Sequence, residues 1–352
     1  MTAFSLENIE PRMTRNQYRH HFSRHLLGVS RHLQNTMMSA LRQQYGHDHL
    51  RLGFSPYITL LGEGDKRLTD LAEILGISRQ ACNQAAKQVV AAGYIERAAD
   101  PLDGRAKQLT LSPRGIKLRR DGLRILVELD QQLADIIDGS RIVDASTSLR
   151  KISHRLSLSF TPQNDDASAK TTMTGLLPRL SDYTLKRLME LTRRKGHPGL
   201  KLRFGQVLGL IGPSGGRIQK IATIQDVSKQ AISAIGTELE ALGYLQRKTD
   251  PRDARQVLLI FTDHGEKLIA DSIISGNELE AEFAEIIGQT ALKRLDATLH
   301  DLYVGLELEQ GIFDTGSAAE ISLLAHQLQQ RLGEQGSKVL ASLLLCPTEY
   351  AR

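Results

Sequence analysis

Two stretches of this 352-residue chain carry amide and basic side chains at spacings that suit contacts with a nucleic acid. In the first stretch Gln80, Asn83 and Gln84 offer amide groups, which can form paired hydrogen bonds with adenine. Lys87 follows at a distance from which it could reach a phosphate. The second stretch has shorter groups, so we expect it to read bases less well and to contribute mainly affinity for the DNA backbone. The candidate contact residues are Ser78, Arg79, Gln80, Asn83, Gln84, Lys87, Ser228, Lys229, Gln230, Ser233 and Thr237.

The two stretches belong to an internal repeat with a constant offset of 150 residues. The first copy runs from Ser78 to Arg105 and the second from Ser228 to Arg255, and no insertion or deletion separates them. Solenoid and propeller repeats have periods of roughly 20–50 residues, whereas this period is close to the size of one ordinary domain. The sequence therefore predicts two copies of one domain in tandem.

Each copy has the signals of a helix, a turn, a second helix and a hairpin. Apolar residues recur at helical spacing from Leu68 to Leu75, and Gly76 supplies the break that a tight turn requires. Ser78 is placed to cap the next helix, which should end at Gly93. Residues 94–111 then favour two short strands around a sharp turn. A helix-turn-helix followed by a β-hairpin is a winged helix.

The hairpin carries the most specific motif in the chain. Asp-Pro-x-Asp-x-Arg occupies residues 100–105 and again 250–255, and each copy follows Gly-Tyr-x-x-Arg. This combination resembles the wing signature of the multiple antibiotic resistance regulator (MarR) family. The resemblance implies a dimer of winged helices, in which each unit places its recognition helix in a major groove of DNA and its wing Arg in the adjacent minor groove. Here one chain carries both winged helices, so simple operator palindromy is not expected.

Six charged residues of the two hairpins are candidates for DNA contact or for support of the wing. The Arg at each tip suits a narrow minor groove, where the negative potential is greatest. The Asp two residues earlier could pair with that Arg or cap the turn, and the resemblance implies that it helps to fix the wing. The Arg beside each strand start could contact a phosphate or be ordinary surface charge. In this order the residues are Arg105 and Arg255, Asp103 and Asp253, and Arg97 and Arg247.

Long helices are expected on both sides of each winged helix, and in the family such helices form the dimer interface. We therefore predict a mainly α fold with small β wings, in which tandem winged helix-turn-helix domains form a single-chain pseudo-dimer through long helices. The expected long helices are 16–45, 114–137 and 142–158 in the first unit, and a shorter 180–195 with 272–287 and 292–308 in the second. The expected domains are 12–160 and 175–310, joined by a polar linker at 161–174 and followed by a C-terminal helical extension at 311–352.

Composition is that of a soluble globular protein, with 41% hydrophobic and 24% charged residues. No apolar run reaches the roughly 18 residues of a membrane span, and residues 1–11 lack the apolar centre of a signal peptide. We therefore expect a cytoplasmic protein without membrane contact. With only Cys82 and Cys346 there is no disulfide framework or thiolate metal site, and we expect Cys82 to be a small buried side chain.

Charge is unevenly distributed along the chain. Residues 11–51 hold seven Arg against one acid, whereas residues 271–320 hold eleven acids against Lys293 and Arg294. Basic segments and both wings could face phosphates, and the acidic helix near the C-terminus should face away from DNA. Taken alone, either run could also be a solvated helix face.

Metal and enzyme signals are weak. His21 and His25 have the i, i+4 spacing of a helical metal pair, but only Asp48 stands nearby to complete a site, so we expect no metal and no cofactor. Residues 212–217 superficially resemble a phosphate loop, yet they lack the Gly-Lys-Ser/Thr ending. The sequence also has no nucleophile elbow and no His-Glu-x-x-His motif. We therefore do not expect an enzyme.

The expected function is that of a sequence-specific transcriptional regulator that binds double-stranded DNA. The family resemblance implies release by a small phenolic or aromatic anion that binds between the winged helix and the dimer helices. The chain would act as a monomeric pseudo-dimer or as a further homodimer. The alternative is a non-specific architectural or protein-binding tandem winged helix, which salt dependence and competitor DNA would distinguish.

Overall fold

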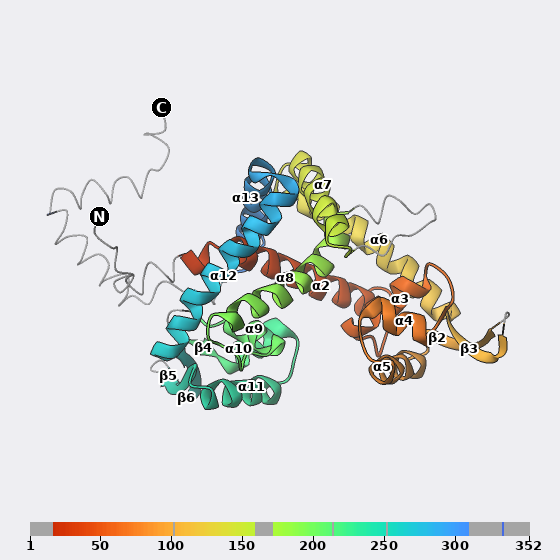
Figure 1. Cartoon of the computed structure of the whole chain (residues 1–352), viewed down its shortest axis with the longest axis horizontal. Helices are drawn as coiled ribbons and strands as arrows, with labels where there is room; N and C mark the ends of the chain where they lie inside the picture. The colour runs from red at the N-terminus through yellow and green to blue at the C-terminus, as the bar shows by residue number, and fades with distance from the viewer. Residues whose placement is uncertain are drawn as a thin grey trace.

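The computed structural model describes residues 17–100, 103–158, 172–212, 215–250, 253–309 and 333. The first half begins with a long helix, continues through a small winged unit and closes with two further long helices (Figure 1). Its elements are α2 (Phe22–Gln43), a short 3₁₀ helix (Leu52–Phe54), α3 (Ser55–Leu61), β1 (Lys66–Arg67), α4 (Leu68–Leu75), α5 (Arg79–Ala91), β2 (Ile95–Asp100), β3 (Asp103–Leu111), α6 (Pro113–Ile136) and α7 (Gly139–Arg155).

The second half repeats this order of elements. From the first short strand onward, each element of the first half has a counterpart that begins 150 residues later. The elements are α8 (Met173–Arg194), α9 (Leu202–Leu208), β4 (Gly216–Arg217), α10 (Ile218–Gln225), α11 (Lys229–Ala241), β5 (Leu245–Asp250), β6 (Asp253–Phe261), α12 (Asp263–Ile287) and α13 (Gln289–Gly305).

The two sheets have the same topology and register. Each is antiparallel, with strand orders β1-β3-β2 and β4-β6-β5. Ile95 pairs with Leu111, and Leu245 pairs with Phe261 at the same place in the second sheet. In both hairpins the register shifts just before the Asp that starts the tip motif, so the outer turn departs from the regular ladder.

The two halves share one hydrophobic core through their long helices. Helix α2 packs against α8, while α7 packs against α8 and α13 packs against α2, so each half covers the other's first helix. In Figure 1, α7 and α13 lie at the top and the two winged units lie below at opposite ends. Apolar side chains from both halves meet in this core, among them Leu26, Leu149, Leu177, Phe283 and Leu299. Separating the halves would expose side chains that each contribute about 1.5–3 kcal/mol when buried.

Helix α8 begins earlier than the sequence suggests. It starts at Met173 and has 22 residues, as many as α2, so the expected linker 161–174 and short helix 180–195 were wrong in their limits. Asp130 of α6 accepts hydrogen bonds from the backbone N–H groups of Met173 and Thr174, both at 2.9 Å. These donors would otherwise be unsatisfied at a helix start, and their partner comes from a distant part of the chain.

Two other helix starts differ from expectation because local caps decide them. The expected helix 16–45 is interrupted: residues 17–19 are helical, and α2 begins at Phe22, since the His21 ring accepts from the Ser23 N–H at 3.3 Å and caps the helix. Helix α12 begins at Asp263 and not at residue 272, because Thr262 caps it by accepting from the Gly265 N–H at 3.1 Å. Most of the expected linker, and all of the C-terminal extension except residue 333, lie outside the described residues.

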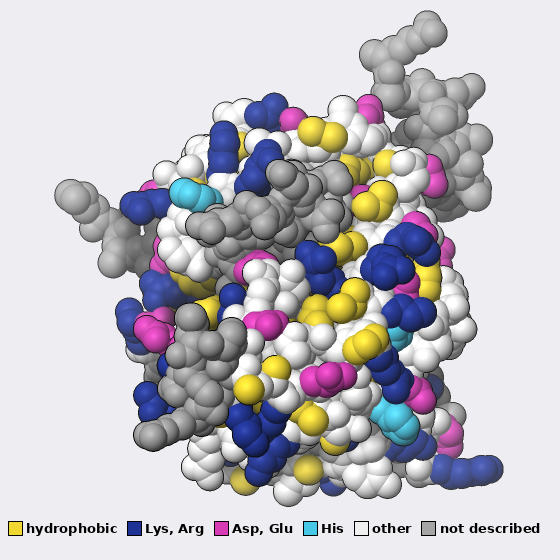
Figure 2. All heavy atoms as spheres, turned by 90° about the vertical axis from the view of Figure 1, so that its right-hand side faces the viewer, with side chains coloured by type: hydrophobic (Ala, Val, Ile, Leu, Met, Phe, Trp, Pro, Cys, Tyr) yellow, Lys and Arg dark blue, Asp and Glu magenta, His cyan; other side chains and the backbone are white. Residues whose placement is uncertain are grey.

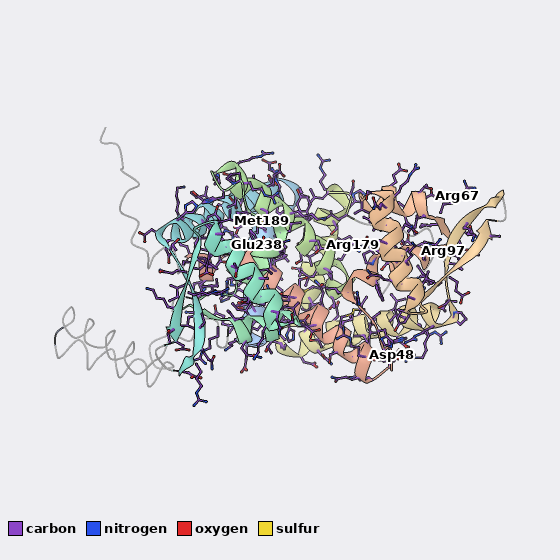
Figure 3. All side chains as sticks on the ribbon, turned by 90° about the horizontal axis from the view of Figure 1, so that it is seen from below. Asp48, Arg67, Arg97, Arg179, Met189 and Glu238 are labelled. Carbon is purple, nitrogen blue, oxygen red and sulfur yellow. The ribbon has the colours of Figure 1, made fainter. Side chains whose placement is uncertain are left out.

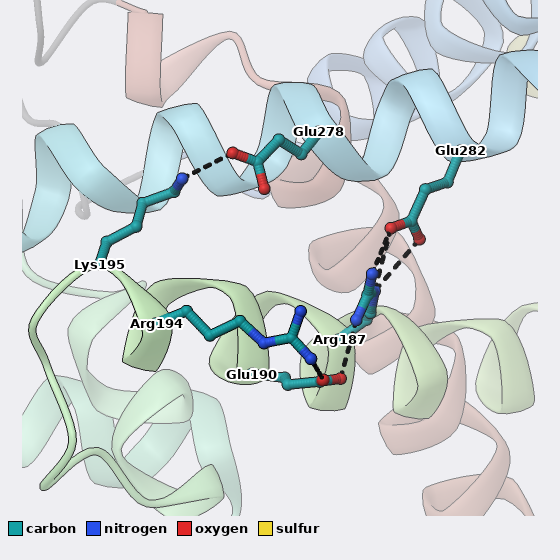
Figure 4. Close-up of polar contacts among 6 residues, drawn as sticks. All are labelled: Arg187, Glu190, Arg194, Lys195, Glu278 and Glu282. Carbon is teal, nitrogen blue, oxygen red and sulfur yellow. Dashed lines mark hydrogen bonds and ion pairs between the residues drawn. The ribbon is translucent and has the colours of Figure 1, made fainter.

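Acidic residues of α12 face basic residues of α8. Arg187 donates to Glu282 with its Nε at 3.1 Å, and Lys195 Nζ lies 2.6 Å from Glu278 (Figure 4). Two of the eleven acidic residues noted for residues 271–320 therefore form ion pairs between these two long helices. Among the described residues, no helix is both long enough and apolar enough to cross a membrane.

A His-Asp pair ties the loop after each first helix to the helix that follows the wing. His47 Nε2 lies 2.8 Å from Asp121 Oδ2 of α6, and Lys117 Nζ lies 2.8 Å from the same oxygen. His197 and Asp271 repeat the pair at 2.9 Å in the second half. Burial alone would raise the pKa of Asp121, but the hydrogen bonds from Lys117 and His47 hold that pKa below its ordinary value.

We expect Asp121→Asn to lower the free energy of unfolding at pH 7 by about 1–3 kcal/mol, because a charged hydrogen-bonding partner is lost. A carboxyl whose folded-state pKa is lowered stabilises the fold above the unfolded-state pKa of about 3.9, and this contribution is lost as the pH falls through the folded-state value. The gap between wild type and variant should therefore close in urea unfolding below about pH 4. Exposed Asp135→Asn is the control, and a gap that persists undiminished in acid would contradict this account.

Candidate nucleic-acid interface

Helices α5 and α11 are the second helices of the two helix-turn-helix units, and their caps are equivalent. Ser78 Oγ accepts from the Ala81 N–H at 3.1 Å, and Ser228 Oγ accepts from the Ala231 N–H at 3.2 Å. Each helix buries three side-chain positions at matching places, which are Cys82, Ala86 and Val89 in α5 and Ile232, Gly236 and Leu239 in α11. Both helices lie along the lower edge of the molecule in Figure 1, with the hairpins at its outer ends.

The opposite faces of α5 and α11 hold the residues selected from the sequence. Nine of the eleven helix candidates are exposed, and the other two, Asn83 and Ser233, are half-buried at equivalent positions. The exposed residues are Ser78, Arg79, Gln80, Gln84, Lys87, Ser228, Lys229, Gln230 and Thr237. Cys82 is buried, with the Tyr57 hydroxyl donating to its carbonyl oxygen at 3.3 Å. The sequence therefore separates the buried and outward faces of these helices correctly.

Arg97 and Arg247 lie between the wing and the recognition helix in each half. Arg97 donates from Nη2 to Asn83 Oδ1 at 2.9 Å. Arg247 donates to the Ser233 carbonyl oxygen at 2.9 Å and to Thr237 Oγ1 at 3.0 Å. These arginines thus brace the helix against the first wing strand, a role that the sequence reasoning did not assign to them.

The outer surface of α11 is more acidic than that of α5. Glu238 and Glu240 stand on α11, whereas α5 contains no acidic residue. Glu238 is paired with Lys201 at 2.7 Å and with Arg203 at 2.6 Å, and Glu240 lies 3.0 Å from Arg247. Figure 3, seen from below, has Glu238 in one half and Arg67 with Arg97 in the other. Lys201, Arg203 and Arg247 are therefore paired with carboxylates of α11 and are less available to a phosphate.

The second wing shows what its Asp does. Asp253 Oδ1 accepts from the backbone N–H of Arg255 at 3.1 Å, and Oδ2 accepts from Gln256 Nε2 at 2.9 Å. Asp253 thus caps the turn through the backbone, and the Arg255 side chain is exposed. In the first wing, the side chains of Asp103 and Arg105 lie outside the described residues.

An ion pair at the base of the second wing was not anticipated. Asp250, the first Asp of the tip motif, is buried, and its Oδ2 accepts from Arg217 Nε of β4 at 2.7 Å. The sequence held a signal for this pair, because Arg67 and Asp100 stand 150 residues before Arg217 and Asp250. In the second unit the first Asp of the motif is thus a structural residue that joins the hairpin to the short strand β4.

A cavity of about 120 Å³ lies between the second winged unit and the long helices. Its lining includes Leu185 and Met189 of α8, Leu208 of α9 and Ile273 of α12. Its polar lining includes Tyr18, Arg24, Arg31 and Tyr303, which the sequence did not mark as residues of one site. Arg24 spans the site, since Nη1 donates to the Gly209 carbonyl oxygen at 2.7 Å and Nη2 to the Tyr303 hydroxyl at 3.3 Å. Burial lowers the pKa of Arg31, with Arg24 adding like charge.

The end of the molecule formed by the first winged unit carries Lys and Arg side chains with acidic side chains between them (Figure 2). Exposed cations at this end include Arg79, Lys87, Arg97 and Lys107. These basic side chains therefore lie at the same end of the molecule as the outward face of α5.

Comparison with protein families identifies the first winged unit. Residues 58–106 match the MarR family. The match extends from α3 to the tip of the first hairpin, so it includes α5 and the wing of the first half. The chain therefore contains a MarR-like unit, as its tip motif indicated.

A solved structure also resembles part of this chain. A transcriptional regulator from Thermotoga maritima, known from its crystal structure, has 22% sequence identity with this chain and a TM-score of 0.28. The likeness covers 37% of this chain and 92% of that protein. No curated protein matches the chain.

The two recognition helices should differ in how strongly they select bases. Gln84→Ala places in α5 the residue type that α11 already has at the equivalent Ala234. In selection of binding sites from random duplex DNA, Gln84→Ala should lose about 1–3 kcal/mol of discrimination at the base pair it contacts. Ser233→Ala should change the selected sequence little, because Arg247 already engages Ser233. Equal relaxation by both variants would count against this asymmetry.

Proposed function

We propose that this protein is a transcriptional regulator that binds double-stranded DNA sequence-specifically, with one chain presenting two winged helices as a pseudo-dimer. One observation carries the proposal: α5 and α11 expose equivalent faces at the same edge of the molecule, and a hairpin stands outside each of them (Figure 1). In this arrangement each helix enters a major groove, and each hairpin follows the backbone toward the neighbouring minor groove.

The contacts within each unit support this assignment. Arg97 and Arg247 fix the recognition helix to the wing, so the helix and the wing tip would reach DNA as one rigid surface. Preorganised side chains lose less conformational entropy on binding than mobile ones. Gln80, Gln84 and Lys87 remain exposed on α5, and the proposal assigns them to base and phosphate contacts. Arg105 and Arg255 are assigned to the minor grooves.

The test is binding to genomic fragments that include the promoter of the protein's own gene. Wild type should select a site with one chain per site, and affinity should fall steeply with salt. The double variant Arg105→Ala, Arg255→Ala should bind that site about tenfold or more weakly, because two minor-groove contacts are lost. Arg155→Ala, on the exposed surface of α7, is the matched control.

Each other outcome of this experiment has a definite meaning. Selective binding by two chains per site would keep the regulatory function but replace the pseudo-dimer with a true dimer. Absence of any preferred site, with binding that competitor DNA abolishes, would overturn specific regulation and favour an architectural protein.

We further propose that the cavity beside α9 binds a small aromatic anion that controls DNA binding. Its apolar lining suits a ring, and the guanidinium groups of Arg24 and Arg31 suit a carboxylate or phenolate. Arg24 also links α2 to Gly209 at the end of α9 and to Tyr303 of α13. An anion that recruits Arg24 would therefore change how the second winged unit is held against the long helices.

Benzoate tests this control, with benzyl alcohol as its neutral analogue. Benzoate should raise the unfolding temperature of wild type, and Arg31→Met should weaken benzoate binding about tenfold because it removes a cation without removing bulk. Benzyl alcohol should bind weakly to both proteins, and Arg155→Met should behave as wild type. Equal benzoate affinity in wild type and Arg31→Met would remove the anion site while leaving the DNA-binding proposal intact.

A further inference from the structure

Three histidines meet where the start of α2 packs against α13. His20, His25 and His300 each offer a ring nitrogen, and these nitrogens all lie within 4.8 Å of one another. The centroids of the His25 and His300 rings are 4.9 Å apart, with the ring planes inclined at 61°, and the His20 ring lies 5.9 Å from that of His300. The cluster joins residues that are 280 positions apart in the sequence, so helical spacing alone could not reveal it.

The burial of the three side chains differs in a useful way. His25 is buried, His300 is half-buried and His20 is exposed. An ion could therefore reach the cluster from solvent past His20 and be held by a preformed interior. The expected helical pair, His21 with His25, is not the one assembled, because His21 instead caps α2 and packs against Gly276 of α12.

Two buried polar atoms beside the cluster have no hydrogen-bond partner among the described residues. These are His25 Nδ1 and Asp296 Oδ1, which lie 3.8 Å apart. A buried donor or acceptor that forms no hydrogen bond costs about 1–3 kcal/mol. The 3.8 Å gap between these two atoms therefore calls for an explanation. Metal-bound imidazoles commonly donate their second ring N–H to a carboxylate, which fixes the ring and its tautomer.

We propose that His20, His25 and His300 form a binding site for a divalent transition-metal ion of the Zn²⁺ class, with Asp296 orienting His25 from outside the coordination shell. In this site His25 Nδ1 donates to Asp296, and Nε2 is left for the metal. Three imidazoles leave a fourth tetrahedral position open to water. Neutral imidazole favours Zn²⁺, Ni²⁺, Co²⁺ or Cu²⁺ over Mg²⁺ or Ca²⁺.

Small side-chain movements would complete the geometry. Tetrahedral ligands at 2.0–2.1 Å from zinc stand about 3.4 Å from one another, so nitrogens within 4.8 Å must approach by roughly an ångström. Side-chain rotations suffice for such a shift, because His20 is exposed and His300 is only half-buried.

The surrounding charges favour a cation at this place. Glu280 of α12 lies 3.3 Å from His21, and burial together with Asp296 raises its pKa to about 7. Arg19 and Arg24 are nearby cations that would oppose a metal. Glu309 accepts from Arg19 Nε at 2.9 Å and so offsets its charge, and Arg24 Nη2 donates to the Tyr303 hydroxyl at 3.3 Å. A bound ion would relieve the repulsion between Glu280 and Asp296.

Titration of the full-length, metal-free chain with Co²⁺ tests the site, because cobalt in a tetrahedral nitrogen site absorbs visible light. Wild type should bind one equivalent, Zn²⁺ should displace it, and Zn²⁺ should raise the unfolding temperature. His20→Ala and His300→Ala should each weaken binding at least tenfold. Asp296→Asn should weaken it about tenfold, as is usual when an outer carboxylate is removed.

His154→Ala is the matched control, since His154 is an exposed helical histidine of α7 outside the cluster. It should leave the titration unchanged. Unfolding of every variant without metal shows whether it remains folded, and His20→Ala serves best here because His20 is exposed. Absence of stoichiometric Co²⁺ binding, or binding that survives in His20→Ala and His300→Ala, would overturn the proposal. None of these measurements depends on DNA.

Discussion

The packing of α2 against α8, covered by α13 and α7 of the opposite halves, is the constraint on which the rest of the structure depends. Each half lacks a complete core of its own among its long helices, because Leu26 of α2 and Leu299 of α13 belong to the same cluster as Leu149 of α7 and Leu177 of α8. Burial of apolar surface is the main favourable term in folding. The relative position of the two winged units therefore depends on this shared packing.

Polar contacts then fix the winged units to this shared core. The His47–Asp121 and His197–Asp271 pairs join the loop after each first helix to the helix after its wing. Both histidines and Asp121 are buried, and Asp271 is half-buried. Breaking such a pair leaves a charge in a low-dielectric surrounding, which is costly. The loop and the helix that the pair connects therefore have one strongly preferred arrangement. The wing, in turn, holds the recognition helix through Arg97 or Arg247. A continuous series of contacts thus runs from the core to the exposed face of α5 and of α11.

Local patterns were sufficient to predict the winged units, and distant contacts explain what they missed. Ser78 and Ser228 cap their helices as expected, and the hairpins begin and end close to the predicted limits. The start of α8 escaped prediction because Asp130, a residue of another helix, satisfies its first N–H groups. Asp250 looked like a turn residue because its partner Arg217 lies on another strand.

The same limit applies to the cavity and to the histidine cluster. Arg24 and Tyr303 meet at one site although 279 positions separate them. Sequence spacing gave no sign of this meeting, because a long helix is readable from its own periodicity while its neighbours are not. The helix faces proposed to contact DNA were predictable for the opposite reason, since exposure, capping and amphipathic pattern are all local properties.

Joining the two units in one chain removes the requirement that they stay identical. In a symmetric dimer any cavity would occur twice. Here, with α2 and α8 aligned from Phe22 and Met173, the residues equivalent to Arg24 and Arg31 are Gly175 and Asp182. Tyr303 is likewise replaced by Ser153 at the offset of 150 residues. An anion site built on these side chains can therefore exist in only one half, so one ligand would act on one recognition helix.

The two recognition helices also differ from each other, and the difference matches the location of the cavity. The cavity adjoins the second winged unit, whose helix α11 carries Glu238 and Glu240, while the amide-rich α5 stands in the other half. If α5 provides base selection and α11 provides adjustable backbone affinity, a ligand beside the second unit would change occupancy without changing the sequence recognised. The shared core would suit this division, because it includes the first winged unit, while the contacts of Arg24 with Gly209 and Tyr303 are among the links between the long helices and the second unit.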